Sequence, residues 1–242
     1  MKTKALFNWS SGKDSAIALY KILQNPEIEI SCLLTSVNKQ FQRISMHGVR
    51  VELLQQQAKS IGIPLEIMTV PEMPTMEVYE SVMKETLLKL KENGITHSIF
   101  GDIFLEDLRS YREEKLASLN MTALFPLWKR DTNDLINEFL SLGFKTIVVC
   151  VNEKYLDKSF VGRIIDHDFI NDLPENVDAC GENGEFHTFT FDGPIFSTPV
   201  NFKIGEIVYR KYEKPTAQKA SNTACNTDDS AFEFGFWYCD LE

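Results

Sequence analysis

The chain of 242 residues has a formal net charge of −10, with 43% apolar and 25% charged residues. This length allows one large domain or two smaller ones, and the composition is typical of a soluble globular protein. The acidic balance disfavours non-specific binding of nucleic acid, which depends on basic surface. No membrane span, signal peptide or Cys-x-x-Cys motif is recognisable. We therefore expect a cytoplasmic protein with reduced thiols.

Strand and helix patterns alternate through the first 130 residues. Apolar runs predict buried strands over residues 5–9, 27–37, 63–70, 96–100 and 123–127. Apolar residues at helical spacing predict helices directly after residue 12 and over residues 51–61, 76–92 and 105–119. Because helices join the successive strands, the pattern predicts an α/β fold with a Rossmann-like, doubly wound parallel sheet.

The rest of the chain has a different pattern. It predicts helices over residues 131–142 and 160–169, and strands over 146–151, 186–191, 202–212 and 232–239. Residues 214–230 are polar and rich in turn formers, so we expect a mobile loop there. The chain is accordingly divided into an α/β domain over residues 1–130 and a smaller C-terminal α+β domain over residues 131–242.

The turn at residues 10–15 (Ser-Ser-Gly-Lys-Asp-Ser) joins the first strand to the first helix. Backbone N–H groups and the positive end of the helix dipole converge there, which suits a phosphate group. The string lacks the Walker pattern but closely resembles the Ser-Gly-Gly-x-Asp-Ser loop of PP-loop ATP pyrophosphatases, which grip the β,γ-pyrophosphate of ATP. Ser11 replaces the first glycine, so we expect a negative φ there. A plain turn with a serine cap is the alternative.

A second candidate group follows the fourth strand. Asp102 lies just past this strand, at the edge of the sheet that also carries the phosphate loop, and could hold Mg²⁺ or a substrate amine. Arg109 and Arg112 share one face of the next helix. For these two arginines we favour a solvated helix face with ion pairs.

Residues 180–188 (Cys-Gly-Glu-Asn-Gly-Glu-Phe-His-Thr) form a third dense group. Two glycines permit a tight turn, while Glu182 and Glu185 could bind magnesium or orient an amine. His187 would point to the same side as Glu185 in an extended segment. A hairpin turn with polar decoration is the alternative. His47, as an isolated histidine in a loop, is expected to be a surface residue.

Taken together, five segments resemble the diphthine–ammonia ligase family of PP-loop ATP pyrophosphatases, within the adenine nucleotide alpha hydrolase superfamily. They are residues 9–15, 47–48, 100–103, 126–128 and 181–188, the last followed by Asp-Gly-Pro at 192–194. The resemblance implies an ATP- and Mg²⁺-dependent ligase that activates a carboxylate as an acyl-adenylate, releases pyrophosphate, and transfers the acyl group to ammonia with release of AMP.

The resemblance also assigns roles to individual residues. Nucleotide binding falls to Ser10, Ser11, Gly12, Lys13, Asp14, Ser15, His47 and Gly101. Asp14 and Asp102 are the candidates for holding the metal and its waters. Catalysis falls to Lys13, Asp14, Glu182, Glu185 and His187.

The expected partners are ATP, ammonia and a carboxylate on a small molecule or protein side chain. No membrane or nucleic acid is expected to bind, and a homodimer is compatible with the resemblance. Two alternatives stay open: a PP-loop enzyme that modifies RNA, and an ATP-binding regulatory module without turnover. The missing cysteine pair and the acidic charge argue against the first.

Overall fold

The computed structural model describes residues 2–44, 47–71, 74–211 and 235–242. Its first sheet is built around the buried strand β1 (Thr3–Asn8), and five of its strands are parallel in the order β4-β2-β1-β5-β6. The short strand β3 (Arg43–Ile44) adds an antiparallel pair at the end of β2. The remaining bounds in this sheet are β2 (Ile28–Asn38), β4 (Leu65–Val70), β5 (His97–Ile99) and β6 (Thr122–Leu124).

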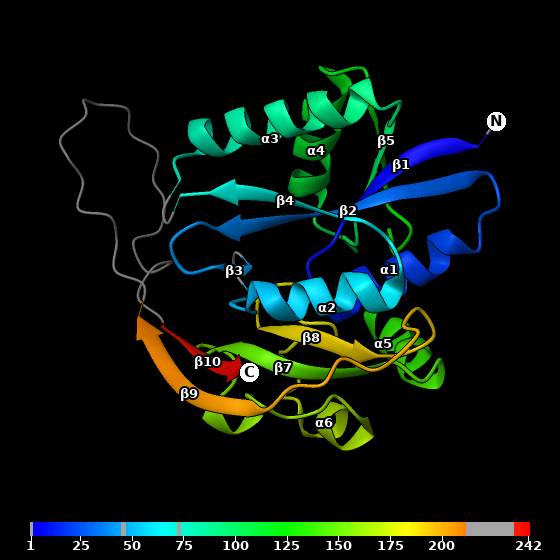
Figure 1. The fold of residues 1–242 in the computed structure, drawn as a ribbon. Coiled ribbons are helices and arrows are strands. Elements are labelled where there is room, and N and C mark those ends of the chain that lie inside the picture. Colours follow the sequence, from blue (N-terminus) through cyan, green and yellow to red (C-terminus); the bar gives the residue numbers. More distant parts are fainter. Residues whose placement is uncertain (1, 45–46, 72–73, 212–234) are drawn as a thin grey trace.

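Helices cover both faces of this sheet (Figure 1). Helices α1 (Lys13–Leu23) and α2 (Val51–Ile61) lie on one face, and α3 (Met76–Glu92) and α4 (Glu106–Ala117) lie on the other. The strand order changes direction at β1, because β2 and β4 extend to one side and β5 and β6 to the other. This is the doubly wound arrangement that the sequence predicts, and ligands of such sheets bind where the order reverses.

The second sheet is antiparallel, in the order β8-β7-β10-β9. It lies beyond α1 and α2, as Figure 1 shows, so these helices are packed between the two sheets. The strands of this sheet are β7 (Lys145–Asn152), β8 (Phe186–Asp192), β9 (Ile204–Lys211) and β10 (Gly235–Leu241). The same part of the chain also forms α5 (Thr132–Ser141), the 3-10 helix η1 (Lys158–Phe160) and α6 (His167–Asp172). The division into two domains near residue 130 stays a prediction.

Local signals explain several element boundaries. Gly62 ends α2 in the left-handed region at φ 80°, and its N–H donates to the Ala58 carbonyl. Thr75 accepts from the Val78 amide at the start of α3. The predicted continuous helix over residues 160–169 is wrong. Gly162 has φ 81°, and the extended residues 163–165 bond back to β7 before α6 begins.

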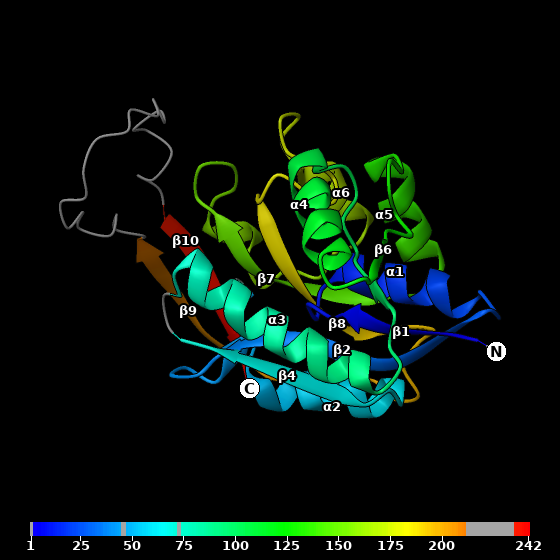
Figure 2. The ribbon, with the colours of Figure 1, turned by 90° about the horizontal axis from the view of Figure 1, so that it is seen from above.

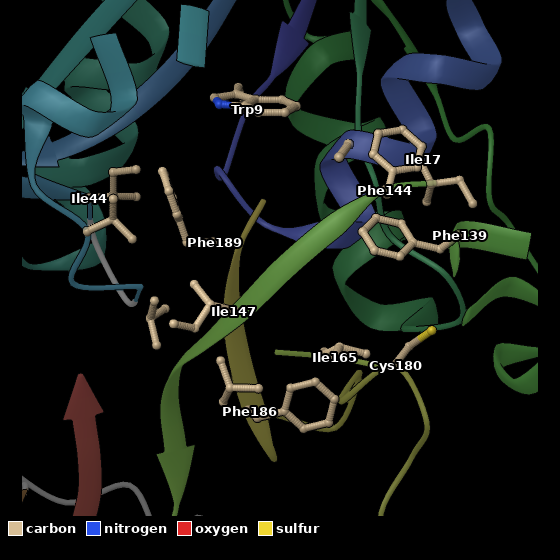
Figure 3. Close-up of a cluster of buried hydrophobic side chains, with 14 of the residues drawn as sticks. Trp9, Ile17, Ile44, Phe139, Phe144, Ile147, Ile165, Cys180, Phe186 and Phe189 are labelled. Carbon is tan, nitrogen blue, oxygen red and sulfur yellow. The ribbon is translucent and has the colours of Figure 1, made fainter. Parts of the chain in front are cut away.

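Two apolar clusters hold these layers together. The larger one joins β1 and α1 to the second sheet, and Figure 3 shows Trp9, Ile17, Ile147 and Phe189 within it. The smaller one fills the space between the first sheet and α3 and α4. The continuity of the larger cluster places the end of β1 against β8, which is the arrangement on which the candidate site depends.

One of the sequence motifs has a packing role, and other predicted segments lie outside the described residues. Gly193 has φ 144°, and a Cβ there would lie 2.3 Å from the Phe144 ring, so the Asp-Gly-Pro turn is fixed by packing. The predicted loop 214–230 and residues 232–234 of the predicted last strand lie outside the described residues. Within the described ranges, no helix combines the length and apolar character needed to cross a membrane.

Candidate active site

The phosphate loop lies at the N-terminus of α1, against strand β8. Gly12 caps the helix in an extended conformation and brings no side chain to its N-terminus. A Cβ at Gly12 would lie 3.1 Å from Cε1 of His47 and 3.2 Å from Oγ1 of Thr188. The Lys13 amide donates to this same Thr188 Oγ1 at 3.0 Å. The first turn of α1 is thus tied to a residue from the far end of the 180–188 stretch.

Ser11 adopts the left-handed conformation, with φ 71°. The prediction of a negative φ at this position is therefore wrong. The Ser11 carbonyl accepts hydrogen bonds from Nε2 of Gln57 (3.1 Å) and from the Thr190 amide (2.9 Å), and these two donors hold the unfavourable backbone in place. Its hydroxyl is buried and has no hydrogen-bond partner among the described residues.

Gln57 is a residue that the sequence analysis missed. It is fully buried on α2, and its Oε1 accepts from the Trp9 indole at 2.9 Å. Its Nε2 donates to the carbonyls of Ser11 and Thr190, the latter at 2.6 Å. Gln57 therefore links β1, the phosphate loop and β8. A glutamine on the apolar face of a predicted helix, beside Leu53, Leu54 and Ala58, is the signal that could have revealed it.

Lys13 and Asp14 form a buried ion pair. The Lys13 ammonium lies 2.8 Å from both carboxylate oxygens of Asp14, and it also donates to the Cys180 carbonyl. Burial alone would lower the pKa of Lys13, but Asp14 and the other acidic groups around it together raise it. Lys13 is therefore cationic, and it attaches the 180–188 stretch to the phosphate loop.

Carboxylates from three segments lie close enough beside the loop to influence one another's pKa. Oε1 of Glu182 accepts from the Ile103 amide at 2.8 Å. Burial and the nearby charge of Asp14 raise the pKa of Glu182 to about 7. The pKa of Asp102 is also raised, by burial and by Asp14, although the charge of Arg112 acts in the opposite direction. Gly101 allows this close approach, because a Cβ there would lie 3.1 Å from the Asp14 carbonyl carbon.

The two arginines of α4 differ in their surroundings. Arg109 forms the expected ion pair, with its Nε 2.8 Å from Glu113. Arg112 instead turns inward: its Nε lies 3.1 Å from Oδ2 of Asp102 and its guanidinium carbon lies 4.2 Å from the centre of the Phe100 ring. The expectation of a solvated face is wrong for Arg112.

Glu185 makes its side-chain hydrogen bonds within the turn that carries it. It is buried, and its Oε1 accepts from the Asp178 amide and from Asn183 Nδ2, both at 3.1 Å. Its Oε2 has no hydrogen-bond partner in the part of the chain that the structure describes. These contacts close the turn over residues 178–185, so Glu185 shapes the segment that carries Glu182.

His47 packs against His187, with ring centroids 4.7 Å apart. Nδ1 of His47 lies 3.2 Å from the Thr188 carbonyl oxygen. Burial lowers the pKa of His47 to about 4 and, together with the neighbouring His47 and Lys13, lowers that of His187 to about 3. The expectation that His47 is an ordinary surface residue is wrong. Both rings are neutral near pH 7, so they act as hydrogen-bonding groups and not as cations.

The carboxylates present a donor set that suits magnesium. Asp14, Asp102 and Glu182 offer hard oxygen ligands of the kind that magnesium prefers. Across the described ranges, no three His, Cys, Asp or Glu side chains are already arranged around one metal position. The assignment of Asp14 and Asp102 as metal ligands remains a proposal.

The histidine pair predicts a specific pH dependence of stability. Below pH 6.5 the unfolded chain binds protons at His187 that the folded chain does not bind until about pH 3, so stability falls as the pH falls. Between pH 7.5 and 5.0 the free energy of unfolding should drop by about 2 kcal/mol more in the wild type than in His187→Gln. Urea unfolding at both pH values measures this difference. The exposed His167→Gln variant should behave like the wild type, and equal losses in all three proteins would contradict the assignment.

Comparison with known proteins identifies the family. A family model described as the diphthamide synthase N-terminal domain matches residues 1–120, and one described as the diphthamide synthase C-terminal domain matches residues 131–218. Human diphthine–ammonia ligase is 28% identical over 166 residues, and the bovine protein is 33% identical over 129 residues. These matches cover 62% and 50% of this chain, and 62% and 48% of the relatives, so the chain spans less than two thirds of their length.

A solved structure was also matched: a U34-tRNA thiolase from Methanococcus maripaludis, with 15% identity and a TM-score of 0.37 over 59% of this chain and 58% of that one. The two family models follow each other in order and together extend over most of the sequence. The chain belongs to the diphthamide synthase family.

Proposed function

We propose that this protein is an ATP-dependent amide ligase, similar to diphthine–ammonia ligase, that forms AMP and pyrophosphate. It activates a carboxylate as an acyl-adenylate and amidates it with ammonia. One observation carries the proposal: the carboxylate-bearing stretch 180–188 is joined to the phosphate loop by Lys13, through its amide to Thr188 and its ammonium to the Cys180 carbonyl. A nucleotide bound at the loop would therefore lie beside the polar side chains of residues 180–188. These side chains could act on the molecule that attacks the activated substrate.

The phosphate loop is suited to the pyrophosphate portion of ATP. The N-terminus of α1 supplies backbone N–H groups and the positive end of its dipole. Ser10 and Ser15 add hydroxyls, which lie 3.1 Å apart, and the buried hydroxyl of Ser11 adds a third. Lys13 contributes a fixed positive charge. These groups would stabilise negative charge that builds up on the leaving pyrophosphate.

Magnesium would be held by Asp14 and Asp102, and it would neutralise phosphate charge when bound. Asp14 also pairs with Lys13, so the same carboxylate would interact with both the ammonium and the metal ion. Gly101 keeps the backbone before Asp102 against the first turn of α1. His47, which packs beside Gly12, would border the nucleotide.

The second half of the reaction needs ammonia in its neutral form. In this step the carbon–nitrogen bond forms, the bond between the acyl carbon and the AMP oxygen breaks, and one proton must leave the nitrogen. Glu182 is our candidate acceptor for this proton, because its pKa of about 7 matches a general base that works near neutral pH. Neutral His187 would accept a hydrogen bond from the amine, and Glu185 would fix the turn that positions Glu182.

The proposed reaction uses ATP, ammonia and a carboxylate as its substrates. The names of the relatives favour diphthine as this carboxylate, and we propose a carboxylate of that class. We also propose that the reaction takes place in the cytoplasm.

Product analysis tests the proposed reaction. Incubation with ATP, magnesium, ammonium and a diphthine-bearing peptide should release AMP and pyrophosphate in equal amounts. If the carboxylate is labelled with ¹⁸O, one label should appear in AMP, because the carboxylate oxygen attacks the α-phosphorus. Asp14→Asn should lower turnover at least about 100-fold, because it weakens the ion pair with Lys13 and the binding of magnesium. Release of ADP and phosphate, or unlabelled AMP, would contradict the proposal.

Glu182→Gln should increase the stability of the protein and slow amide formation. The folded pKa of Glu182 is raised to about 7, so this carboxylate costs stability progressively as the pH rises from 4.5 to 7. We expect Glu182→Gln to be more stable than the wild type by about 3 kcal/mol at pH 8 and equal to it at pH 4. The variant should still exchange pyrophosphate into ATP when the carboxylate is present, yet form amide about 100-fold more slowly. Wild-type amide formation would exclude Glu182 as the base.

A further inference from the structure

A cavity of about 770 Å³ lies on the face of the first sheet opposite α1. It is bounded by α3 and α4 and by the ends of β1 and β5, and Figure 2 shows the two helices over this face. Its wall includes Asn8, Ser98 and Phe100 from the strands, and Tyr79, Met83 and Arg112 from the helices. A cavity of this volume can enclose a small molecule or an extended side chain.

Arg112 is a cation of the cavity wall whose hydrogen-bonding capacity is incompletely used. Its Nε and Oδ2 of Asp102 are 3.1 Å apart, but neither buried atom has an aligned hydrogen-bond partner among the described residues. The Phe100 ring, 4.2 Å from the guanidinium carbon, fixes the plane of the side chain. A guanidinium held in this way can bind a carboxylate through two parallel hydrogen bonds.

The cavity adjoins the phosphate loop, because the ends of the same strands border both. Asn8 is the last residue of β1 and comes two residues before Ser10, while Phe100 directly precedes Gly101. The Asp102 carboxylate interacts with both Arg112 and Asp14, so it lies between the cavity and the loop. Arg112 therefore connects the cavity wall, through Asp102, to the segment that packs against the first turn of α1.

We propose that this cavity binds the carboxylate substrate and that the Arg112 guanidinium anchors its carboxylate. The assignment rests on the proposed ligase function and deepens it. Arg112 is a positioning residue that holds the nucleophilic oxygen next to the α-phosphate. The substrate class is an extended carboxylate of amino-acid size. The alternative occupant is the adenosine portion of ATP, and the experiment separates the two.

The test places a reactive thiol in the cavity. Met83→Cys introduces it on the cavity side of α3, and Leu88→Cys introduces a control on the exposed side of the same helix. Each variant is treated with iodoacetate, which carries a carboxylate, and with iodoacetamide, its neutral analogue. Mass spectrometry of the peptide that contains the new thiol measures both alkylation rates, so reactions at native cysteines do not interfere.

The ratio of the iodoacetate rate to the iodoacetamide rate is the diagnostic quantity. We expect Arg112→Gln to lower this ratio about tenfold at the Met83→Cys thiol and to leave it unchanged at the Leu88→Cys thiol. An Arg112-independent ratio at the cavity thiol would overturn the proposal. Full protection of this thiol from iodoacetamide by adenosine would overturn it as well, because adenosine would then fill the cavity. If the ratio depends on Arg112 but the protein does not turn over ATP, the ligase function fails and the carboxylate site stands.

Discussion

The carbonyl oxygen of Ser11 receives hydrogen bonds from the side chain of Gln57 and from the backbone of Thr190, and the rest of the site depends on this arrangement. A left-handed conformation costs a residue such as serine about 1–2 kcal/mol, which the surrounding contacts must offset. One donor comes from α2 and the other from β8. The shape of the phosphate loop is therefore held jointly by a helix of the first sheet and a strand of the second.

The same contact brings the chemistry of the 180–188 stretch to the loop. Thr188 accepts from the first amide of α1, and Lys13 reaches back to Cys180. Between these two points the chain carries Glu182 and His187. Their pKa values are shifted in opposite directions, to about 7 and about 3, because burial disfavours the charged form of each. The site keeps a carboxylate that costs stability, which is characteristic of residues retained for ligand binding or catalysis.

Local sequence signals predicted the elements well and the contacts between them poorly. The bounds of α3 and the end of α2 before Gly62 follow from neighbouring residues, and the structure confirms them. Gln57 is bonded to residues 46 and 133 positions away, and this spacing leaves no local pattern. The same holds for the φ of Ser11, which is set by donors from other elements. The fold class was therefore predictable, whereas the way the loop is held was not.

The affinity for ATP of two valine variants on β8 tests most directly whether the second sheet holds the phosphate loop in its binding form. Thr188→Val removes the hydroxyl that accepts from the Lys13 amide, whereas Thr190→Val removes one that contacts Thr146 within the second sheet. Isothermal titration with a non-hydrolysable ATP analogue and magnesium should show about tenfold weaker binding for Thr188→Val, which corresponds to the loss of one buried hydrogen bond. Thr190→Val should bind like the wild type. Wild-type affinity in Thr188→Val, or equal losses in both variants, would contradict this account.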